Sequence, residues 1–371
     1  MDIEFLNLYS DFDIFKNLQE KFFPPNELKL IGLDVFSDYV HSTGYFTDYF
    51  DFILLENNKY FFYVADVSRN GCYSLFIVNL LKIFLRNFIN NYRFPNIILS
   101  ILNSKFVDII LPDFFISFFC GIYDNSTKKL LYSTAGFPEI LLIKNKSNKI
   151  ESLKTNGNII NLKNNSEYEL KEVYLDLNDK LFFFTNGFLN QNFSLNDIKN
   201  FLLENNNLYS KDLLKKLSDN FINKKNTTSN FLTLLFEIKD NYICLHTLDE
   251  IMNFIKFLEI YFRHLNIDVA TLTNLIISIQ EAAINAFSHG NKEDITKKII
   301  IFYEYKKENG TFLIRIRDEG EGFDYNNLPD PTKDENLLKE SGRGIFIIKS
   351  YMDKVFFNDK GNEITMIKKI F

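Results

Sequence analysis

The sequence predicts an α+β protein built from more than one domain. Its 371 residues are enough for two or three domains of ordinary size. Short runs rich in β-branched and aromatic residues dominate positions 28–238, whereas positions 241–371 combine long helical patterns with strands. We therefore expect a β-rich domain at 28–238, preceded by an N-terminal helix at 1–27, and an α/β domain at 241–371.

The composition allows real hydrophobic cores and argues against two kinds of partner. Hydrophobic residues make up 46% and charged residues 24%, as in ordinary globular proteins. A formal net charge of −6 argues against a nucleic-acid-binding surface. The longest apolar region, residues 106–123, is interrupted by acids and a proline, so no membrane span is expected. The scattered cysteines and the lack of a signal peptide predict a cytoplasmic protein.

Hydrophobic periodicity locates the elements of the front domain. Strands are expected at residues 32–40, 51–56, 59–65, 114–123, 129–134, 179–188 and 231–238, and helices at 74–88 and about 195–223. Residues 144–167, rich in Asn, Lys and Ser, are expected to be a loop insertion. Residues 1–23 have apolar positions at helical spacing and end at two prolines. This helix is expected to pack on the next domain, and pairing with a second copy in a homodimer stays open.

The segment QEAAINAFSHGN, at residues 280–291, carries the strongest chemical signal in the chain. Glu281 and Asn285 lie four residues apart, so both side chains project from one helix face. The carboxylate can polarise a hydroxyl or water, and the amide oxygen can hold magnesium, which suits phosphoryl transfer. Such a pair is also common on solvated helix faces, so context decides. His289, on the same side, either orients the phosphate site or is a structural histidine.

Two glycine clusters supply that context. Residues 312–317 alternate as a strand that runs directly into DEGEGFD at residues 318–324. Asp318 offers an acceptor for an exocyclic amine, and glycines let the backbone approach a flat ligand closely. The second cluster, Gly-Arg-Gly at residues 342–344, opens a helix whose free N–H groups favour phosphate.

In this order and spacing, the motifs resemble the GHKL ATP-binding fold, and most closely the anti-sigma-factor serine kinases. The resemblance covers residues 245–371 and implies an α/β sandwich that binds ATP and magnesium. It makes Glu281 the general base and Asn285 the magnesium ligand, and it implies an ATP lid at residues 325–341. The other ATP-binding positions that it implies are Asp318, Gly320, Gly322, Gly342, Arg343, Gly344 and Thr365.

The front of the chain resembles a second family, the SpoIIE-like branch of the protein phosphatase 2C type. The motifs that carry this resemblance include ADVSRNG at residues 65–71, YSTAGFPEILL at 132–142 and FTNG at 184–187. The resemblance covers about residues 15–238 and implies a β-sandwich flanked by helices. Such a site holds two divalent cations, manganese or magnesium, and needs several carboxylates to offset their repulsion.

The metal site that this resemblance implies is only partly preserved. Asp66 would bridge both metals, with Asp48 in the outer shell. The family's other two metal aspartates fall at Asn186 and Asn230, where an amide oxygen carries no charge. Arg69 replaces a turn glycine and restricts backbone approach. We therefore expect a degenerate phosphatase domain that is nearly inactive or kept for binding, and the two aspartates are alternatively remnants or turn formers.

The sequence leaves several functions open. The first is an ATP-dependent serine kinase acting on a STAS-type anti-anti-sigma protein in partner switching, with a sigma factor as second client. The second is a non-catalytic ATP-binding regulator that sequesters a partner, and an active bifunctional phosphatase and kinase is a further alternative. The third is a sensor histidine kinase with His246 or His264 as phosphoacceptor. His246 lies only 35 positions before Glu281 (281 − 246), which is too short for a dimerising hairpin and the start of the ATP domain.

Overall fold

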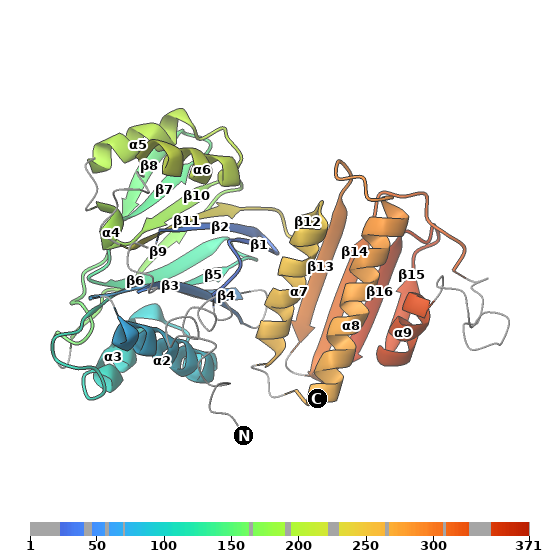
Figure 1. Cartoon of the computed structure of the whole chain (residues 1–371), viewed down its shortest axis with the longest axis horizontal. Helices are drawn as coiled ribbons and strands as arrows, with labels where there is room; N and C mark the ends of the chain where they lie inside the picture. Colours follow the sequence, from blue (N-terminus) through green and yellow to red (C-terminus); the bar gives the residue numbers. More distant parts are fainter. Residues whose placement is uncertain are drawn as a thin grey trace, which may run out of the picture.

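The computed structural model has two parts placed side by side (Figure 1). It describes residues 23–40, 47–55, 59–69, 71–162, 166–189, 194–221, 230–263, 267–306, 309–325 and 343–370. Positions 1–22 of the expected N-terminal helix, most of the expected lid, His264 and Gly342 therefore lie outside the described residues. Within the described ranges, no helix combines the length and the apolarity that crossing a membrane would need.

Two antiparallel sheets form the first part and confirm the expected β-sandwich (Figure 1). Their strand orders are β1-β2-β11-β10-β7-β8 and β3-β4-β5-β6-β9. The strands are β1 (Glu27–Leu30), β2 (Leu33–Val40), β3 (Asp48–Leu54), β4 (Lys59–Val67), β5 (Ile116–Asp124), β6 (Lys129–Ala135), β7 (Ile140–Lys144), β8 (Lys149–Leu153), β9 (Lys171–Tyr174), β10 (Lys180–Phe184) and β11 (Phe231–Ile238).

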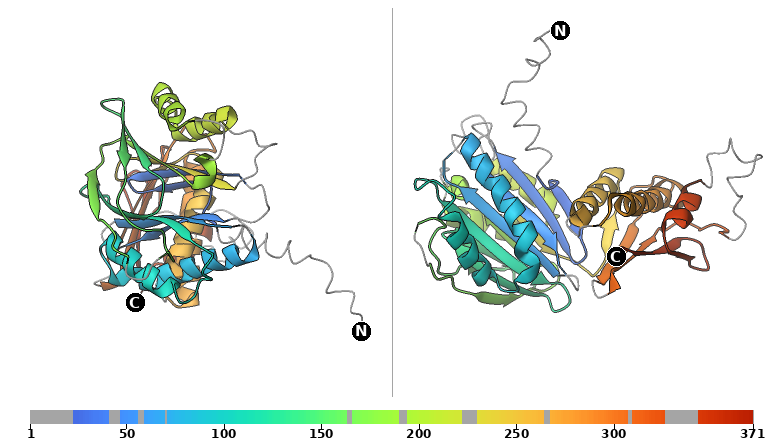
Figure 2. Two further views of the ribbon diagram at one scale, coloured as in Figure 1. Left: turned by 90° about the vertical axis from the view of Figure 1, so that its left-hand side faces the viewer. Right: turned by 90° about the horizontal axis from the view of Figure 1, so that it is seen from below.

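Helices cover the outer faces of both sheets (Figure 2). Aromatic rings fill the space between the two sheets. The β3–β9 sheet carries α2 (Cys72–Phe88), the short η3 (Ile89–Asn91) and α3 (Pro95–Phe106), and the other sheet carries α4 (Asn186–Leu189), α5 (Leu195–Glu204) and α6 (Ser210–Phe221). Between the sheets, the ring of Phe62 packs edge-on against Phe183 and Phe236, at centroid distances of 6.0 and 5.0 Å. Such pairs add to the stability gained from burial.

The expectation of a loop across residues 144–167 is wrong at its first part. Residues 140–153 form a hairpin in which β8 pairs with β7, and Lys144 lies opposite Lys149. Asn148 adopts a φ of 46° in the connecting turn, a conformation that asparagine tolerates better than most residues. β8 is an edge strand with exposed polar side chains, and this composition made it look like a loop in the sequence.

The second part is one antiparallel sheet with helices packed on it, which confirms the expected α/β sandwich (Figure 1). The strand order is β12-β13-β14-β16-β15. The elements are β12 (Ile243–Leu245), α7 (Leu248–Arg263), α8 (Val269–Asn285), η4 (Ala286–Gly290), β13 (Ile299–Lys306), β14 (Thr311–Arg317), α9 (Arg343–Tyr351), β15 (Lys354–Phe357) and β16 (Glu363–Lys369). The Asp268 side chain begins α8 by accepting the Thr271 N–H at 2.9 Å.

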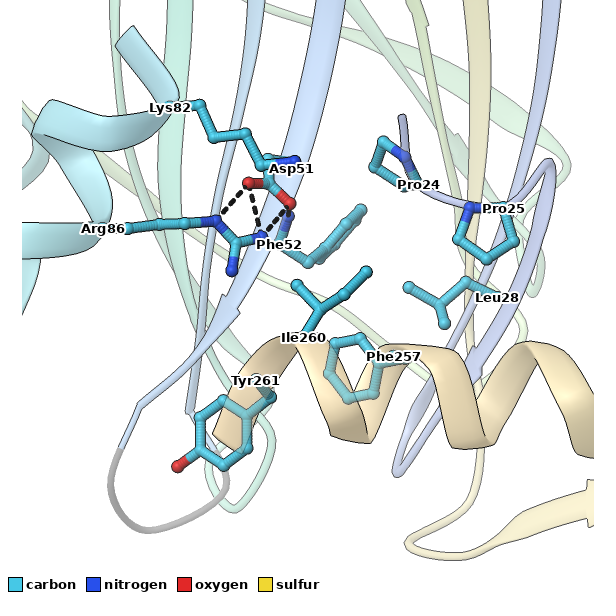
Figure 3. Close-up of a pocket in the computed structure, with 10 residues that line it drawn as sticks. All are labelled: Pro24, Pro25, Leu28, Asp51, Phe52, Lys82, Arg86, Phe257, Ile260 and Tyr261. Carbon is cyan, nitrogen blue, oxygen red and sulfur yellow. Dashed lines mark hydrogen bonds and ion pairs between the residues drawn. The ribbon is translucent and has the colours of Figure 1, made fainter. Parts of the chain in front are cut away.

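One continuous hydrophobic core joins the two parts, because α7 packs on β1 as well as on its own sheet. A small hollow at this junction is lined on the sandwich side by Leu28 and Phe52, and on the α7 side by Phe257, Ile260 and Tyr261 (Figure 3). Beside it, Arg86 of α2 donates to both carboxylate oxygens of Asp51, at 2.8 and 2.6 Å, and both side chains are only 5% exposed. Burial of each large apolar side chain contributes about 1.5–3 kcal/mol, so α7 is stabilised by both parts.

Polar contacts cross the same junction. The hydroxyls of Tyr60 on β4 and Tyr303 on β13 lie 3.4 Å apart in the buried core. Lys29 on β1 donates to Glu250 on α7 at 2.7 Å, and the Lys29 side chain is 8% exposed. Buried polar groups need partners, so these contacts fix how the two parts meet.

Asp34, on β2, is a buried carboxylate whose titration should affect stability. Burial raises the pKa of Asp34 from its ordinary value of 3.8 to about 7, and the nearby Lys29 and Lys239 oppose this rise only in part. An acid with a raised pKa in the folded state costs stability as pH rises above its unfolded pKa, and the full cost is reached above its folded pKa.

We therefore expect Asp34→Asn to raise the free energy of unfolding at pH 8, by roughly 1–3 kcal/mol, and to leave it nearly unchanged at pH 4. Urea unfolding of both proteins at the two pH values measures this difference. An equal effect at both pH values would contradict the raised pKa.

Candidate functional site

Glu281 and Asn285 lie one turn apart on α8, and the start of α9 packs against both. A β-carbon on Gly344, the second residue of α9, would lie 2.7 Å from Oε2 of Glu281 and 3.0 Å from Nδ2 of Asn285. A side chain at position 344 would therefore press on the ends of both side chains, and glycine lets α9 begin directly beside them. This contact sets the first turn of α9, where helical N–H groups lack intrahelical partners, beside a carboxylate and an amide.

Asp318 directly follows β14 and lies against the end of the helical segment that begins with α8. A β-carbon on Gly290 would lie 2.3 Å from the carboxyl carbon of Asp318, and one on Gly320 would lie 2.3 Å from the carbonyl oxygen of Gly290. Oδ1 of Asp318 accepts the Gly320 N–H at 2.8 Å. Burial raises the pKa of Asp318, and this hydrogen bond opposes the rise. Two glycines thus make room for a half-buried carboxylate at the end of the helix.

A widened turn explains how the helix reaches the Asp318 loop. α8 passes into the π-helical turn η4, which is closed by a 2.9 Å hydrogen bond from the N–H of Asn291 to the carbonyl of Ala286. The periodicity of the sequence predicts a helix but not this change of pitch. Turns of this kind occur often at functional sites. His289, within the turn, is exposed, and its role in orienting phosphate stays a prediction.

Two asparagines that the motifs did not single out hold the Asp318 loop. The backbone oxygen of Asn362 accepts the Asp318 N–H at 3.0 Å, and its Nδ2 donates to the Asp318 carbonyl at 2.9 Å. Oδ1 of Asn291 accepts the Glu319 N–H at 2.9 Å, while its Nδ2 donates to the Lys298 carbonyl at 3.0 Å. Each asparagine directly follows a glycine, Gly290 or Gly361, and a turn-anchoring amide is common at such a place, but no local pattern links either residue to Asp318.

Thr365 does not lie with Glu281, Asn285 and Asp318. On β16, its cross-strand neighbours are Arg315 and the exposed Phe356, whereas Ile364 and Met366 belong to the core that contains α8. Side chains alternate between the two faces of a strand, so Thr365 points away from the helices. The adenine-side position expected for Thr365 is therefore corrected, and Ile364 is its neighbour on the helix-facing side.

The other expected positions of the second part are placed as follows. Gly322 adopts a φ of 82°, and a β-carbon there would lie 1.8 Å from the Lys360 carbonyl oxygen, so this turn requires glycine. Arg343 begins α9. Gly342 precedes it outside the described residues.

The four expected metal positions of the first part meet at one end of the sandwich. Asp48 on β3 lies directly opposite Asp66 on β4. Oδ2 of Asp66 accepts the backbone N–H of Asn186 at 3.0 Å and its side-chain N–H at 2.9 Å. Asn230 directly precedes β11, and its Nδ2 lies 3.5 Å from Oγ1 of Thr47.

This group carries fewer carboxylates than a site for two divalent cations needs. Burial, and then the charge of Asp66, raise the pKa of Asp48, which is 4% exposed. Burial also raises the pKa of Asp66, although hydrogen bonds from Asn186 oppose this. Two carboxyls this close share a proton when no cation lies between them, and two N–H groups of Asn186 point at Asp66. Among the described residues, no three or more His, Cys, Asp or Glu side chains could hold a metal ion together.

Arg69 takes up the turn position at which the family has glycine. Its φ of 70° lies in the left-handed region that favours glycine. Its guanidinium lies 5.4 Å from the ring centre of Phe114 and 3.5 Å from the carboxylate of Asp113. The side chain is therefore accommodated outside the group formed by Asp48 and Asp66.

Comparisons with known proteins give a match for each part. Residues 246–368 match the histidine kinase-like ATPase domain, and residues 56–231 match Stage II sporulation protein E (SpoIIE). Serine-protein kinase RsbW of Staphylococcus aureus is 37% identical over 102 residues, which are 25% of this chain and 63% of RsbW. The chain thus spans less than two thirds of that relative's length.

A solved structure resembles nearly the whole chain. The crystal structure of the RsbU and RsbW domains of Rv1364c from Mycobacterium tuberculosis matches with a TM-score of 0.54 at 15% identity. The match covers 92% of this chain and 95% of that one. At this identity it shows a common fold in which the same two kinds of domain follow one another.

Proposed function

Because the chain joins a SpoIIE-type phosphatase domain to an RsbW-like ATPase domain, we propose that it is an ATP-dependent protein-serine kinase of partner switching. Its substrate is a STAS-type anti-anti-sigma protein, a sigma factor is its second client, and it works in the cytoplasm. The contact of Gly344 with Glu281 and Asn285 carries this proposal, because it sets a helix N-terminus beside a general base and a magnesium ligand. The domains are taken as residues 28–238 and 241–371.

The residues present fit ATP and magnesium. Bound ATP supplies the phosphoryl group. Asp318 accepts a hydrogen bond from the amine of the base, with Gly320 and Gly322 shaping its loop. The amide oxygen of Asn285 holds magnesium, and the first turn of α9 faces the phosphates. Glu281 takes the proton of the substrate's serine hydroxyl.

The phosphatase-type domain is proposed to dock or sense the same substrate without hydrolysing it. Two of the four metal positions carry no charge, and the remaining carboxyls of Asp48 and Asp66 are held by burial and by N–H groups. A pair of divalent cations needs more negative charge than this group supplies.

The test is phosphate transfer by the full-length chain. With labelled ATP, magnesium and a STAS-domain protein, we expect acid-stable phosphate on a serine of that protein. Binding of ATP and partner without transfer would support the non-catalytic regulator instead. Acid-labile phosphate on His246 or His264 would support a histidine kinase, and a lack of any nucleotide affinity would overturn the proposal.

A further inference from the structure

We infer that Asn362 and Asn291 are positioning residues that give the nucleotide pocket its selectivity for a base carrying an exocyclic amine. The inference rests on the proposed function, because it takes the pocket as an ATP site. Asn362 lies outside the motifs that assign Glu281, Asn285 and Asp318, and Asn291 ends the first of them without a role assigned to it. Both are amides buried almost completely, at 5% and 1% exposure, and the side chain of each makes one hydrogen bond to the loop that begins with Asp318.

Asn362 holds the backbone of Asp318 at two points. It accepts the N–H of Asp318 with its backbone oxygen and donates from Nδ2 to the Asp318 carbonyl, at 3.0 and 2.9 Å. Asn362 is itself fixed by Asn358, which donates to Oδ1 of Asn362 at 2.9 Å and accepts its backbone N–H at 3.0 Å. The turn between β15 and β16 therefore acts as a rigid clamp on Asp318.

Asn291 holds the next residue of the loop from the opposite side. It accepts the Glu319 N–H at 2.9 Å, and the Glu319 carboxylate accepts the N–H of Lys298 at 2.8 Å. Asn291 also ends the widened turn η4, whose Gly290 lies against the Asp318 carboxylate. Hydrogen bonds therefore hold the loop both to the end of the helical segment that carries Glu281 and to the turn before β16.

The direction of the Asp318 carboxylate depends on the hydrogen bonds made by Asn362 and on those made by Asn291. A hydrogen bond weakens steeply when the angle at its hydrogen departs from linearity, so a small shift of the loop would cost the contact with a base amine. The first turn of α9 and the pair of Glu281 and Asn285 lie on other elements. Loss of the Asn362 side chain leaves only the backbone hydrogen bond to Asp318, so it should weaken recognition of the base while the phosphate end keeps its geometry.

The experiment compares ATP with purine riboside triphosphate, which lacks the exocyclic amine, in the full-length protein. A hydrogen bond to a charged acceptor predicts that the wild type prefers ATP by about tenfold or more. Asn362→Ala should lose most of this preference and raise the KM for ATP, with kcat at saturating ATP little changed. Asp318→Asn should also lose the preference. Asn309→Ala, in the turn before β14 and away from the pocket, is the matched control and should keep it.

The outcomes separate the inference from the proposed function. If the wild type binds neither nucleotide, the ATP site itself is wrong. The inference is wrong if Asn362→Ala keeps the preference for ATP that the wild type and Asn309→Ala show. A merely structural asparagine would change the affinity for both nucleotides equally. Thermal melting checks each variant, and where Asn362→Ala does not fold, Asn362→Ser and Asn291→Ser decide between the same two results.

Discussion

Replacing Glu281 with glutamine in the full-length protein is expected to slow phosphate transfer to a STAS-type partner by about 10²–10⁴-fold. Glutamine has nearly the same size, so the close contact with Gly344 is kept. It cannot take a proton from a serine hydroxyl, and this proton transfer is the step that the carboxylate serves. Since Asp318 and Asn285 are unchanged, the affinity for ATP should stay close to that of the wild type.

Transfer is measured with labelled ATP under single-turnover conditions, and ATP affinity by calorimetry on the same preparations. Glu304→Gln, on β13, is the matched control and should transfer at the wild-type rate. A Glu281→Gln variant that transfers as fast as the wild type would show that another group is the base. A variant that loses ATP binding would instead point to a structural role.

The second large effect is a gain of metal binding when Asn186 and Asn230 are both changed to aspartate. The two new carboxylates would lie beside Asp48 and Asp66, where the structure now has N–H groups directed at Asp66. Without metal, four clustered carboxyls repel one another, so the variant should melt below the wild type. With manganese at about a hundred times its dissociation constant, binding should restore about 2.7 kcal/mol of stability.

Melting curves with and without manganese measure this gain, and hydrolysis of a phosphoserine peptide should arise with it. The control variant carries Asn220→Asp and Asn309→Asp, which add the same charge elsewhere, and it should show no response to manganese. The wild type should show none either. If manganese stabilises the wild type and Asp66→Ala loses this effect, the present residues already hold a metal.

Local motifs in the sequence were sufficient to predict where the residues of the candidate ATP site lie. Glu281 and Asn285 could be placed on one helix face because helical spacing fixes their geometry, and Asp318 could be placed at a strand end because glycines follow it directly. The sandwich was recognised for a similar reason, since its turns and strands follow one another in a fixed order.

What the sequence could not supply depends on register and on distant contacts. Thr365 directly follows Ile364, which faces the helices, and in a strand a shift of one residue changes the face. Asn362 acts on a residue 44 positions earlier in the chain, so no local pattern marks it. The π-helical turn after Asn285 lies against Asp318, and helical periodicity encodes neither the turn nor this distant contact.

The core shared by β1 and α7 makes the two parts interdependent in water. Phe257 and Tyr261 of α7 meet Leu28 and Phe52 of the sandwich, so each part completes the other's interior. A foreign counterpart in place of either part would leave these apolar side chains without matching partners. Each part expressed alone would therefore expose an apolar surface to water that the full-length chain keeps buried.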